Sequence, residues 1–206
     1  MNAPAKLTLT KSARSVTLTK PGQGQGVMRV NLNWTQPEPV KKGFLGKLLG
    51  GPAGVDLDLG CLYELADGSK GVIQALGDSF GSLSGPPHIA LDADDRTGAA
   101  TGGENLRIDL TRPELFRRIL IFAMIYEGAP NWAAVDGVVT MYPTAGPQVE
   151  VRLDSPVEGS RLCAIALVTS SGTEVNVQRE VQYVDGNQAD LDAVYGWGLR
   201  WAAGSK

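Results

Sequence analysis

Acidic side chains occur in two stretches whose spacing could form a cation site. In VDLDL, strand alternation directs Asp56 and Asp58 to one face, about 6.5–7 Å apart along the strand. A second group lies in and just after a glycine-rich loop and consists of Asp92, Asp94, Asp95 and Glu104. Closely spaced carboxylates beside glycines suit a hard cation, because Ca²⁺ takes about 6–8 oxygen ligands. We therefore expect Ca²⁺ to bind where the two stretches meet.

Two alternatives for these acids remain open. Aspartates in turns commonly accept hydrogen bonds from their own backbone and bind nothing else. A pair of carboxylates could also act as general acid and base in a glycosidase-like hydrolase, although the sequence shows no aromatic sugar platform and no second motif for such an enzyme. A further D-x-D pair, Asp190 and Asp192, falls in a helical pattern, where we expect both side chains to face solvent.

Other catalytic chemistry has little support in the sequence. Histidine occurs once, as His88 in GPPHIAL, which excludes a zinc site with several imidazoles, and no G-x-S-x-G motif is present. Cys61 and Cys163 lie within apolar strand-like runs, where we expect buried free thiols. Neither a P-loop nor a G-x-G-x-x-G turn for nucleotides occurs. We expect a protein that is not an enzyme.

The elements that must position the acids are strands, because apolar and polar residues alternate with a period of two along most of the chain. Such runs occupy 7–11, 15–20, 27–34, 55–65, 105–110, 137–142, 148–154 and 173–184. More continuous apolar runs at 117–127 and 162–168 predict central strands, and turn residues at 143–147 and 170–173 predict hairpins. The pattern predicts an all-β fold, a sandwich of two mainly antiparallel sheets with a short C-terminal helix at 187–198.

Length and composition indicate one domain over 1–206, with a loop inserted at 36–54. The similar stretches LTLTK at 7–11 and SVTLTK at 15–20 predict two adjacent strands at a sheet edge. Within the inserted loop, an apolar cluster between lysines at 41–50 could fold over the sandwich edge or dock on a partner or an anionic membrane surface. A metal-independent scaffold that docks through 41–50 is therefore an alternative to a calcium-binding protein.

Charge and hydropathy restrict the partners. The 19 Lys and Arg against 22 Asp and Glu give a net charge of −3, which argues against nucleic-acid binding. The apolar run at 119–126 is far shorter than the roughly 18–20 residues of a membrane-spanning helix. The N-terminal residues MNAPAKLTLTKS interleave polar residues and lack the apolar core of a signal peptide. We expect a cytoplasmic protein that does not span a membrane.

The order of several motifs resembles the TerD family of tellurium-resistance and stress proteins. These motifs are VNLNW, GVDLDLGCLYEL, DADDRTG, GENLRIDL, IYEGA and YGWGLRW, and they extend over most of the chain. The resemblance implies a calcium-binding β-sandwich that acts in bacterial tellurite resistance and related stress, together with other tellurium-resistance proteins and a membrane partner. By motif match it implies metal ligands at Asp56, Asp58, Asp94, Asp95 and Glu104, with Asp92 as a neighbour. Glu127 in IYEGA matches a family acid without an assigned role.

One departure from the family pattern concerns the metal. Family members carry an acid-rich DGDDE run before the strand, where this chain has TGGE at 101–104. Because calcium affinity follows the charge of the ligands, we expect weaker binding than is usual for the family, or one ion where the family has two.

Overall fold

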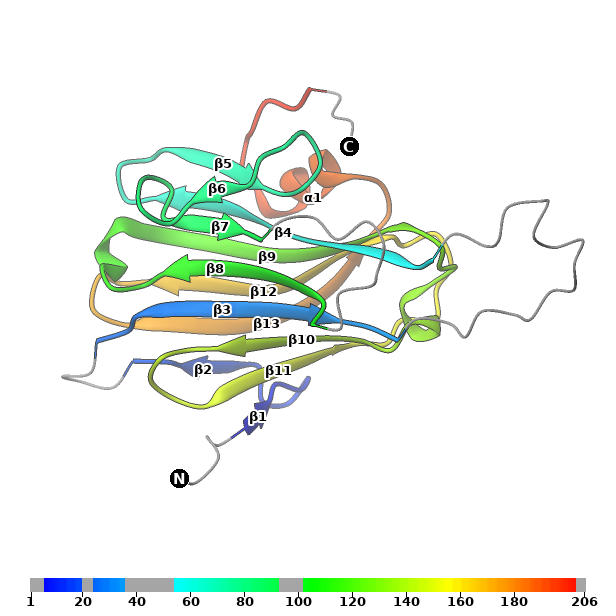
Figure 1. Ribbon diagram of the computed structural model, residues 1–206, viewed down its shortest axis with the longest axis horizontal. Helices are drawn as coiled ribbons and strands as arrows, with labels where there is room; N and C mark the ends of the chain where they lie inside the picture. Colours follow the sequence, from blue (N-terminus) through cyan, green and yellow to red (C-terminus); the bar gives the residue numbers. More distant parts are fainter. Residues whose placement is uncertain (1–5, 20–23, 36–53, 93–101, 203–206) are drawn as a thin grey trace, which may run out of the picture.

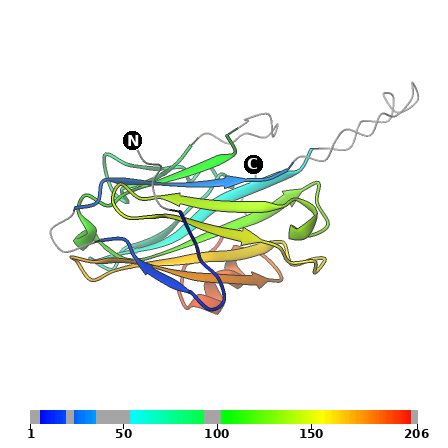
Figure 2. The ribbon, with the colours of Figure 1, turned by 90° about the horizontal axis from the view of Figure 1, so that it is seen from below.

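The computed structural model of the protein describes residues 6–19, 24–35, 54–92 and 102–202. These residues form two stacked sheets, which lie as two layers in Figure 2. The seven-stranded sheet contains, in spatial order, β1 (Lys6–Thr8), β11 (Gln148–Leu153), β10 (Gly137–Tyr142), β3 (Val27–Asn33), β8 (Glu104–Asp109), β7 (Ile89–Leu91) and β6 (Gly81–Ser82). The six-stranded sheet contains β2 (Ser15–Thr17), β13 (Val175–Val184), β12 (Leu162–Ser170), β9 (Phe116–Glu127), β4 (Asp56–Leu65) and β5 (Lys70–Ile73).

Neighbouring strands are antiparallel throughout these sheets, except that β1 pairs with β11 in parallel. Two short 3₁₀ helices, η2 (Pro113–Leu115) and η3 (Trp132–Ala134), lie in the connections on either side of β9. One α-helix, α1 (Gln188–Tyr195), follows the last strand in the described part of the chain (Figure 1). The prediction of an all-β sandwich with a short C-terminal helix is confirmed.

The central strands of the six-stranded sheet, β4, β9 and β12, are buried on both faces. The inner face of the sheet packs against the other sheet, and residues such as Leu57, Leu59 and Ile121 belong to this main core. Its outer face carries a second apolar cluster, in which Phe122 packs with Trp197 beneath α1. Figure 2 shows α1 below the layer that contains β12 and β13. Burial of both faces explains why β9 and β12 are continuously apolar and why they occupy the interior of the sheet, as the sequence predicts.

The predicted hairpins at 143–147 and 170–173 are also present, because β10 pairs with β11 and β12 pairs with β13. The two similar N-terminal stretches, however, do not form neighbouring strands. The strand β1 lies at the edge of the seven-stranded sheet, and β2 lies at the edge of the six-stranded sheet. The prediction of edge strands is correct and the prediction of adjacency is wrong, because the chain crosses from one sheet to the other between these strands.

The C-terminal segment is held on the outer face by a buried carboxylate, Asp192, whose side chain is only 4% exposed. Its Oδ1 accepts the backbone N–H of Gly198 at 2.6 Å, and its Oδ2 accepts the N–H of Leu199 and the indole Nε1–H of Trp201, both at 2.8 Å. The expectation that Asp190 and Asp192 face solvent is therefore wrong for Asp192. The backbone turns back after α1 and brings three donors to one side chain, which a helical pattern does not reveal.

A second polar contact joins α1 to the sheet. Glu64 is buried on β4, and the Nε of Arg118 donates to its Oε2 at 2.7 Å. The guanidinium of Arg118 also lies 3.8 Å from the ring centroid of Trp197 and donates to the carbonyl of Tyr195. The hydrogen bond from Arg118 holds the pKa of Glu64 below its ordinary value, against the opposing effect of burial. These contacts fix the C-terminal end of α1 over β4 and β9.

No helix in residues 6–19, 24–35, 54–92 and 102–202 has both the length and the hydropathy needed to cross a bilayer. The inserted loop at 36–54, with the proposed docking residues 41–50, lies outside the described residues except for Gly54.

Candidate metal centre

The first residues of β4 are held in place by two neighbouring segments. The indole Nε1 of Trp34, the residue after β3, donates to the carbonyl of Val55 at 3.2 Å. Gly128, just after β9, has φ +81°, and a Cβ at this position would lie 2.8 Å from the Cα of Val55. Only glycine allows both this backbone conformation and this close approach. The backbone that leads into Asp56 is therefore fixed from two sides.

Both predicted ligands on β4 are buried. Asp56 is 7% exposed and Asp58 is 3% exposed. Leu57 and Leu59 belong to the core between the sheets, as strand alternation predicts. A bulge in the pairing with β9 lies between Asp56 and Leu57, so the regular alternation is interrupted at the first of the two aspartates. Two carboxylates that are nearly inaccessible to water on one strand need hydrogen bonds or positive charge to stabilise them.

The structure brings Glu104 to this strand, although the two lie in different sheets. Glu104 begins β8, is 5% exposed, and its Oε2 accepts the backbone N–H of Leu59 at 2.6 Å. The donor is accessible because β5 pairs with β4 only from Cys61 onward, which leaves the edge of β4 uncovered by β5 at Leu59. The residue before Glu104 is Gly103, which has φ +64°, and a Cβ at this position would collide with the carbonyl oxygen of Leu32. A carboxylate from one sheet thus lies beside the residue that follows Asp58 in the other.

Asp92 is placed elsewhere. Its Oδ1 forms an ion pair with Arg107 of β8 at 2.6 Å, and both side chains are partly exposed. Arg107 is exposed whereas its neighbours Leu106 and Ile108 are buried, so this pair lies on the outer face of the seven-stranded sheet. Glu104 shares the inward-facing alternation of Leu106 and Ile108. The side chains of Asp92 and Glu104 therefore belong to opposite faces of the sheet, and Asp92 has a partner of its own.

Asp94 and Asp95 lie outside the described residues. Within the ranges that are described, no three His, Cys, Asp or Glu side chains are grouped so that they could hold a metal ion by themselves. A complete cation site at Asp56, Asp58 and Glu104 would therefore need additional oxygen ligands, which backbone carbonyls, water or residues 93–101 would have to supply.

Glu127 is the acid of the IYEGA motif, and its position is now defined. It ends β9, is exposed, and is the register partner of Asp56 across the antiparallel pair. The sequence predicted strands with Asp56 near the start of one and Glu127 at the end of the other, but the register of β4 on β9 was needed to pair them.

The side chains around this end of β4 offer hard oxygen donors rather than soft ones. Cys61 and Cys163 are buried free thiols, as predicted. Burial raises the pKa of Cys61, and a backbone hydrogen bond from Ile73 opposes that rise only in part. Neutral buried thiols are poor metal ligands and poor nucleophiles. The Nδ1 of His88 lies 3.2 Å from the carbonyl of Leu83, in a turn of its own. The donor set therefore fits Ca²⁺ or Mg²⁺ and does not fit zinc or copper.

Comparison with known structures supports the fold. Two crystal structures align with 86% of this chain and with all of the other chain, each with a TM-score of 0.58. One is SAV2460, a protein of unknown function, at 19% identity. The other is SCO6318 from Streptomyces coelicolor A3(2), described as a homologue of the telluride resistance protein TerD, at 20% identity. At these identities the likeness shows a shared fold and nothing more.

Comparison of sequences extends this relationship. No family model matches the chain. The tellurium resistance protein TerA of Alcaligenes sp. is 41% identical over 202 residues, which is 98% of this chain. The aligned region is 59% of TerA, so the chain spans a little more than half the length of this relative. The resemblance to tellurium-resistance proteins that the sequence motifs indicate is therefore confirmed, and the chain is a relative of TerA along nearly its whole length.

Proposed function

We propose that the protein is a non-enzymatic, calcium-binding member of the tellurium-resistance proteins. The observation that supports this proposal best is the contact between Glu104 of one sheet and the backbone of Leu59 in the other, directly beside Asp58. Asp56 and Asp58 of β4 and Glu104 of β8 are all buried. Because a buried ionised carboxylate is costly without positive charge nearby, a divalent ion coordinated by these side chains at the edge of β4 would stabilise this part of the sandwich.

The ion would act by linking the sheets. Asp56 and Asp58 belong to the six-stranded sheet and Glu104 to the seven-stranded sheet, so shared coordination would join the two layers where β5 leaves the edge of β4 uncovered. Asp94 and Asp95, by their place in the sequence between β7 and β8, are the further ligands we propose. Calcium would then order the connection between β7 and β8 and present it to partner proteins.

Calorimetric titration with CaCl₂ tests this proposal on protein stripped with EDTA. We expect wild-type protein to bind calcium, and Asp58→Asn and Glu104→Gln each to weaken binding by about tenfold or more. Glu150→Gln is the matched control, because Glu150 of β11 is also a buried glutamate, 6% exposed. Its carboxylate forms ion pairs with Lys6 of β1 and Arg152 of β11. We expect this variant to bind calcium as the wild type does.

Thermal unfolding separates a cation site from an internally neutralised cluster. If the free calcium concentration is about one hundred times the Kd, calcium binding adds about 2.7 kcal/mol to the free energy of unfolding. This raises Tm by about 5–10 °C in a chain of this size. We expect Asp58→Asn to abolish this rise. An absence of calcium heat in the wild type, or calcium binding that is unchanged in both variants, would show that these carboxylates are neutralised within the protein.

We further propose that the protein is cytoplasmic and acts together with other tellurium-resistance or stress proteins and with a membrane partner. The name of TerA supports tellurium resistance as the pathway. The absence of a reactive thiol among Cys61 and Cys163 argues for binding rather than for redox chemistry on tellurite. Growth on tellurite of a deletion strain that carries wild-type protein or Asp58→Asn would test this role, and equal protection by both would contradict a calcium-dependent one.

A further inference from the structure

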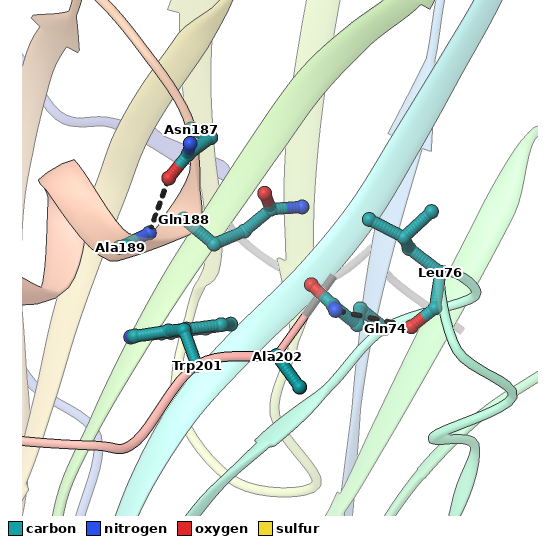
Figure 3. A pocket seen from close by; sticks show the side chains of 7 residues that line it. All are labelled: Gln74, Leu76, Asn187, Gln188, Ala189, Trp201 and Ala202. Carbon is teal, nitrogen blue, oxygen red and sulfur yellow. Dashed lines mark hydrogen bonds between the residues drawn. The ribbon is translucent and has the colours of Figure 1, made fainter. Parts of the chain in front are cut away.

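A separate pocket lies on the outer face of the six-stranded sheet, between the turn after β5 and the start of α1 (Figure 3). Its volume is about 370 Å³, which lies in the range of small-molecule sites. The residues that line it are Gln74, Leu76, Asn187, Gln188, Ala189, Trp201 and Ala202. None of these side chains carries a charge, so the pocket offers no counter-charge to an ionic ligand.

The wall of the pocket contains an unsatisfied acceptor. Gln74 is 9% exposed, and its Oε1 has no hydrogen-bond partner among the described residues. The amide cannot be reversed to remove this acceptor, because its Nε2 donates to the carbonyl of Leu76 at 3.0 Å and a reversed amide would place two oxygens together. Figure 3 shows the oxygen directed toward the space between Gln188 and Trp201. Since a buried acceptor without a donor costs stability, a ligand hydroxyl or N–H would be favoured there.

Opposite this acceptor lies a flat apolar surface. The indole of Trp201 is oriented by the hydrogen bond from its Nε1 to Asp192. In Figure 3 the ring is seen edge-on, its nitrogen is directed away from Gln74, and one ring face is turned toward Gln188 and Ala189. The six-membered part of the indole is thereby presented to the pocket. Such a face packs against the C–H face of a saturated ring or against another flat molecule.

The remaining polar groups can both donate and accept. The amide of Gln188 contacts the Sδ of Met124 at 3.7 Å, which is a weak partner for Nε2, and Figure 3 shows this amide directed into the pocket. Asn187 uses its Oδ1 to cap the N–H of Ala189 at 2.8 Å, and its Nδ2 remains available as a donor. Several hydroxyl groups, each of which donates and accepts, match such a set of amides better than one edge of a heterocycle does.

We propose that this pocket binds a neutral pyranose sugar, with one ring face on Trp201 and a hydroxyl group that donates to Gln74 Oε1. Among the described residues that line it there is no carboxylate to act as an acid or base, so we propose a site that binds the sugar rather than one that cleaves it. The pocket is close to the candidate metal centre, because Met124, which Gln188 contacts, is the register partner of Asp58. The proposal does not need the metal, and it is tested in the presence of EDTA.

Proton–nitrogen correlation spectra of the whole chain, recorded during titration with neutral methyl pyranosides and N-acetylglucosamine, test the site. We expect saturable shifts of the Trp201 indole N–H and of the Gln74 and Gln188 side-chain amides, with Kd of about 1–10 mM. Sorbitol, which has the hydroxyls without the ring face, and glucuronate, which adds a charge, should bind about tenfold more weakly or not at all.

Gln74→Leu should weaken sugar binding by about tenfold, because it removes the acceptor while it retains the size of the side chain. Gln188→Leu is the second variant in case the turn after β5 needs the Gln74 amide. Gln178→Leu on β13 is the control. The Gln178 side chain is exposed, and among the described residues its amide donates a hydrogen bond to Glu180. An absence of saturable shifts with every pyranoside would overturn the proposal. So would equal affinity in the wild type and in both pocket variants.

Discussion

Replacing Asp192 tests how the C-terminal segment is attached to the sandwich. Asp192 is 4% exposed and accepts three hydrogen bonds, from Gly198 N, Leu199 N and Trp201 Nε1, at 2.6, 2.8 and 2.8 Å. In Asp192→Ala all three donors lose a charged acceptor at once. The segment they hold contributes Trp197 to the outer apolar cluster and Trp201 to the pocket. The substitution therefore affects both the stability of the fold and the shape of the pocket.

The expected loss follows from the number of bonds and the exposure of their donors. A hydrogen bond to a charged group contributes about 1.5–3 kcal/mol, so three bonds give an upper limit of about 9 kcal/mol. Gly198 is exposed and Leu199 and Trp201 are partly exposed, so water can replace part of each bond. We expect Asp192→Ala to lower the free energy of unfolding by about 4 kcal/mol. Asp192→Asn retains one acceptor oxygen, and we expect a loss of about 2 kcal/mol.

Urea unfolding followed by circular dichroism measures these losses, and the indole N–H resonance of Trp201 reports the local contact. Glu158→Ala is the matched control, because it removes the same charge from an exposed glutamate. We expect this control to change the free energy of unfolding by less than about 0.5 kcal/mol. The reasoning fails if Asp192→Ala is no less stable than the control, or if the Trp201 resonance is the same in both variants.

Three further substitutions and modifications test other parts of the structure. Because the pKa of Glu64 is lowered in the folded protein, its carboxylate stabilises the fold above its ordinary pKa, and this contribution is lost as the pH falls through the folded value. The Tm of the wild type should therefore fall more steeply than the Tm of Glu64→Gln as the pH is lowered from about 5 to 3. Parallel curves of Tm against pH would contradict this. Gly103→Ala should cost about 1–3 kcal/mol in urea unfolding, because φ is +64° and a Cβ would collide with the carbonyl of Leu32. Gly102→Ala, with nothing within 4 Å, should cost less than Gly103→Ala, and equal losses would remove the argument. Burial raises the pKa of both Cys61 and Cys163, so an aromatic disulfide reagent at about pH 8 should react with them only after unfolding, whereas rapid labelling of native protein would show that they are accessible.

Alternation of apolar and polar residues was enough to predict the long strands and the class of fold. The run at 55–65 corresponds to β4 and the run at 117–127 to β9, because each buries a long row of side chains whose period is visible in the sequence. The strands β5, β6 and β7 were missed. They have two to four residues each, which is too short for a period to be recognised, and they are defined by their neighbours rather than by their own residues.

The candidate site shows the same division. The D-x-D pattern in an apolar strand was enough to single out Asp56 and Asp58 as candidate metal ligands, and the structure shows that both are buried. That Glu104 reaches the backbone of Leu59 depends on how two sheets are stacked, which no local pattern specifies. The placement of Asp92 on the outer face follows from its pairing with Arg107, which comes from another strand.

By itself, the sequence determined the long strands, which of their side chains face the core, and the kind of oxygen donors available, because these depend on residue type and on the spacing of neighbours along the chain. Only the tertiary structure decided which strands lie side by side, which carboxylates share an end of the sandwich, and how Gln74 comes to lie near Trp201. Those contacts join residues far apart in the chain, and they form because both faces of the six-stranded sheet must be covered by other elements.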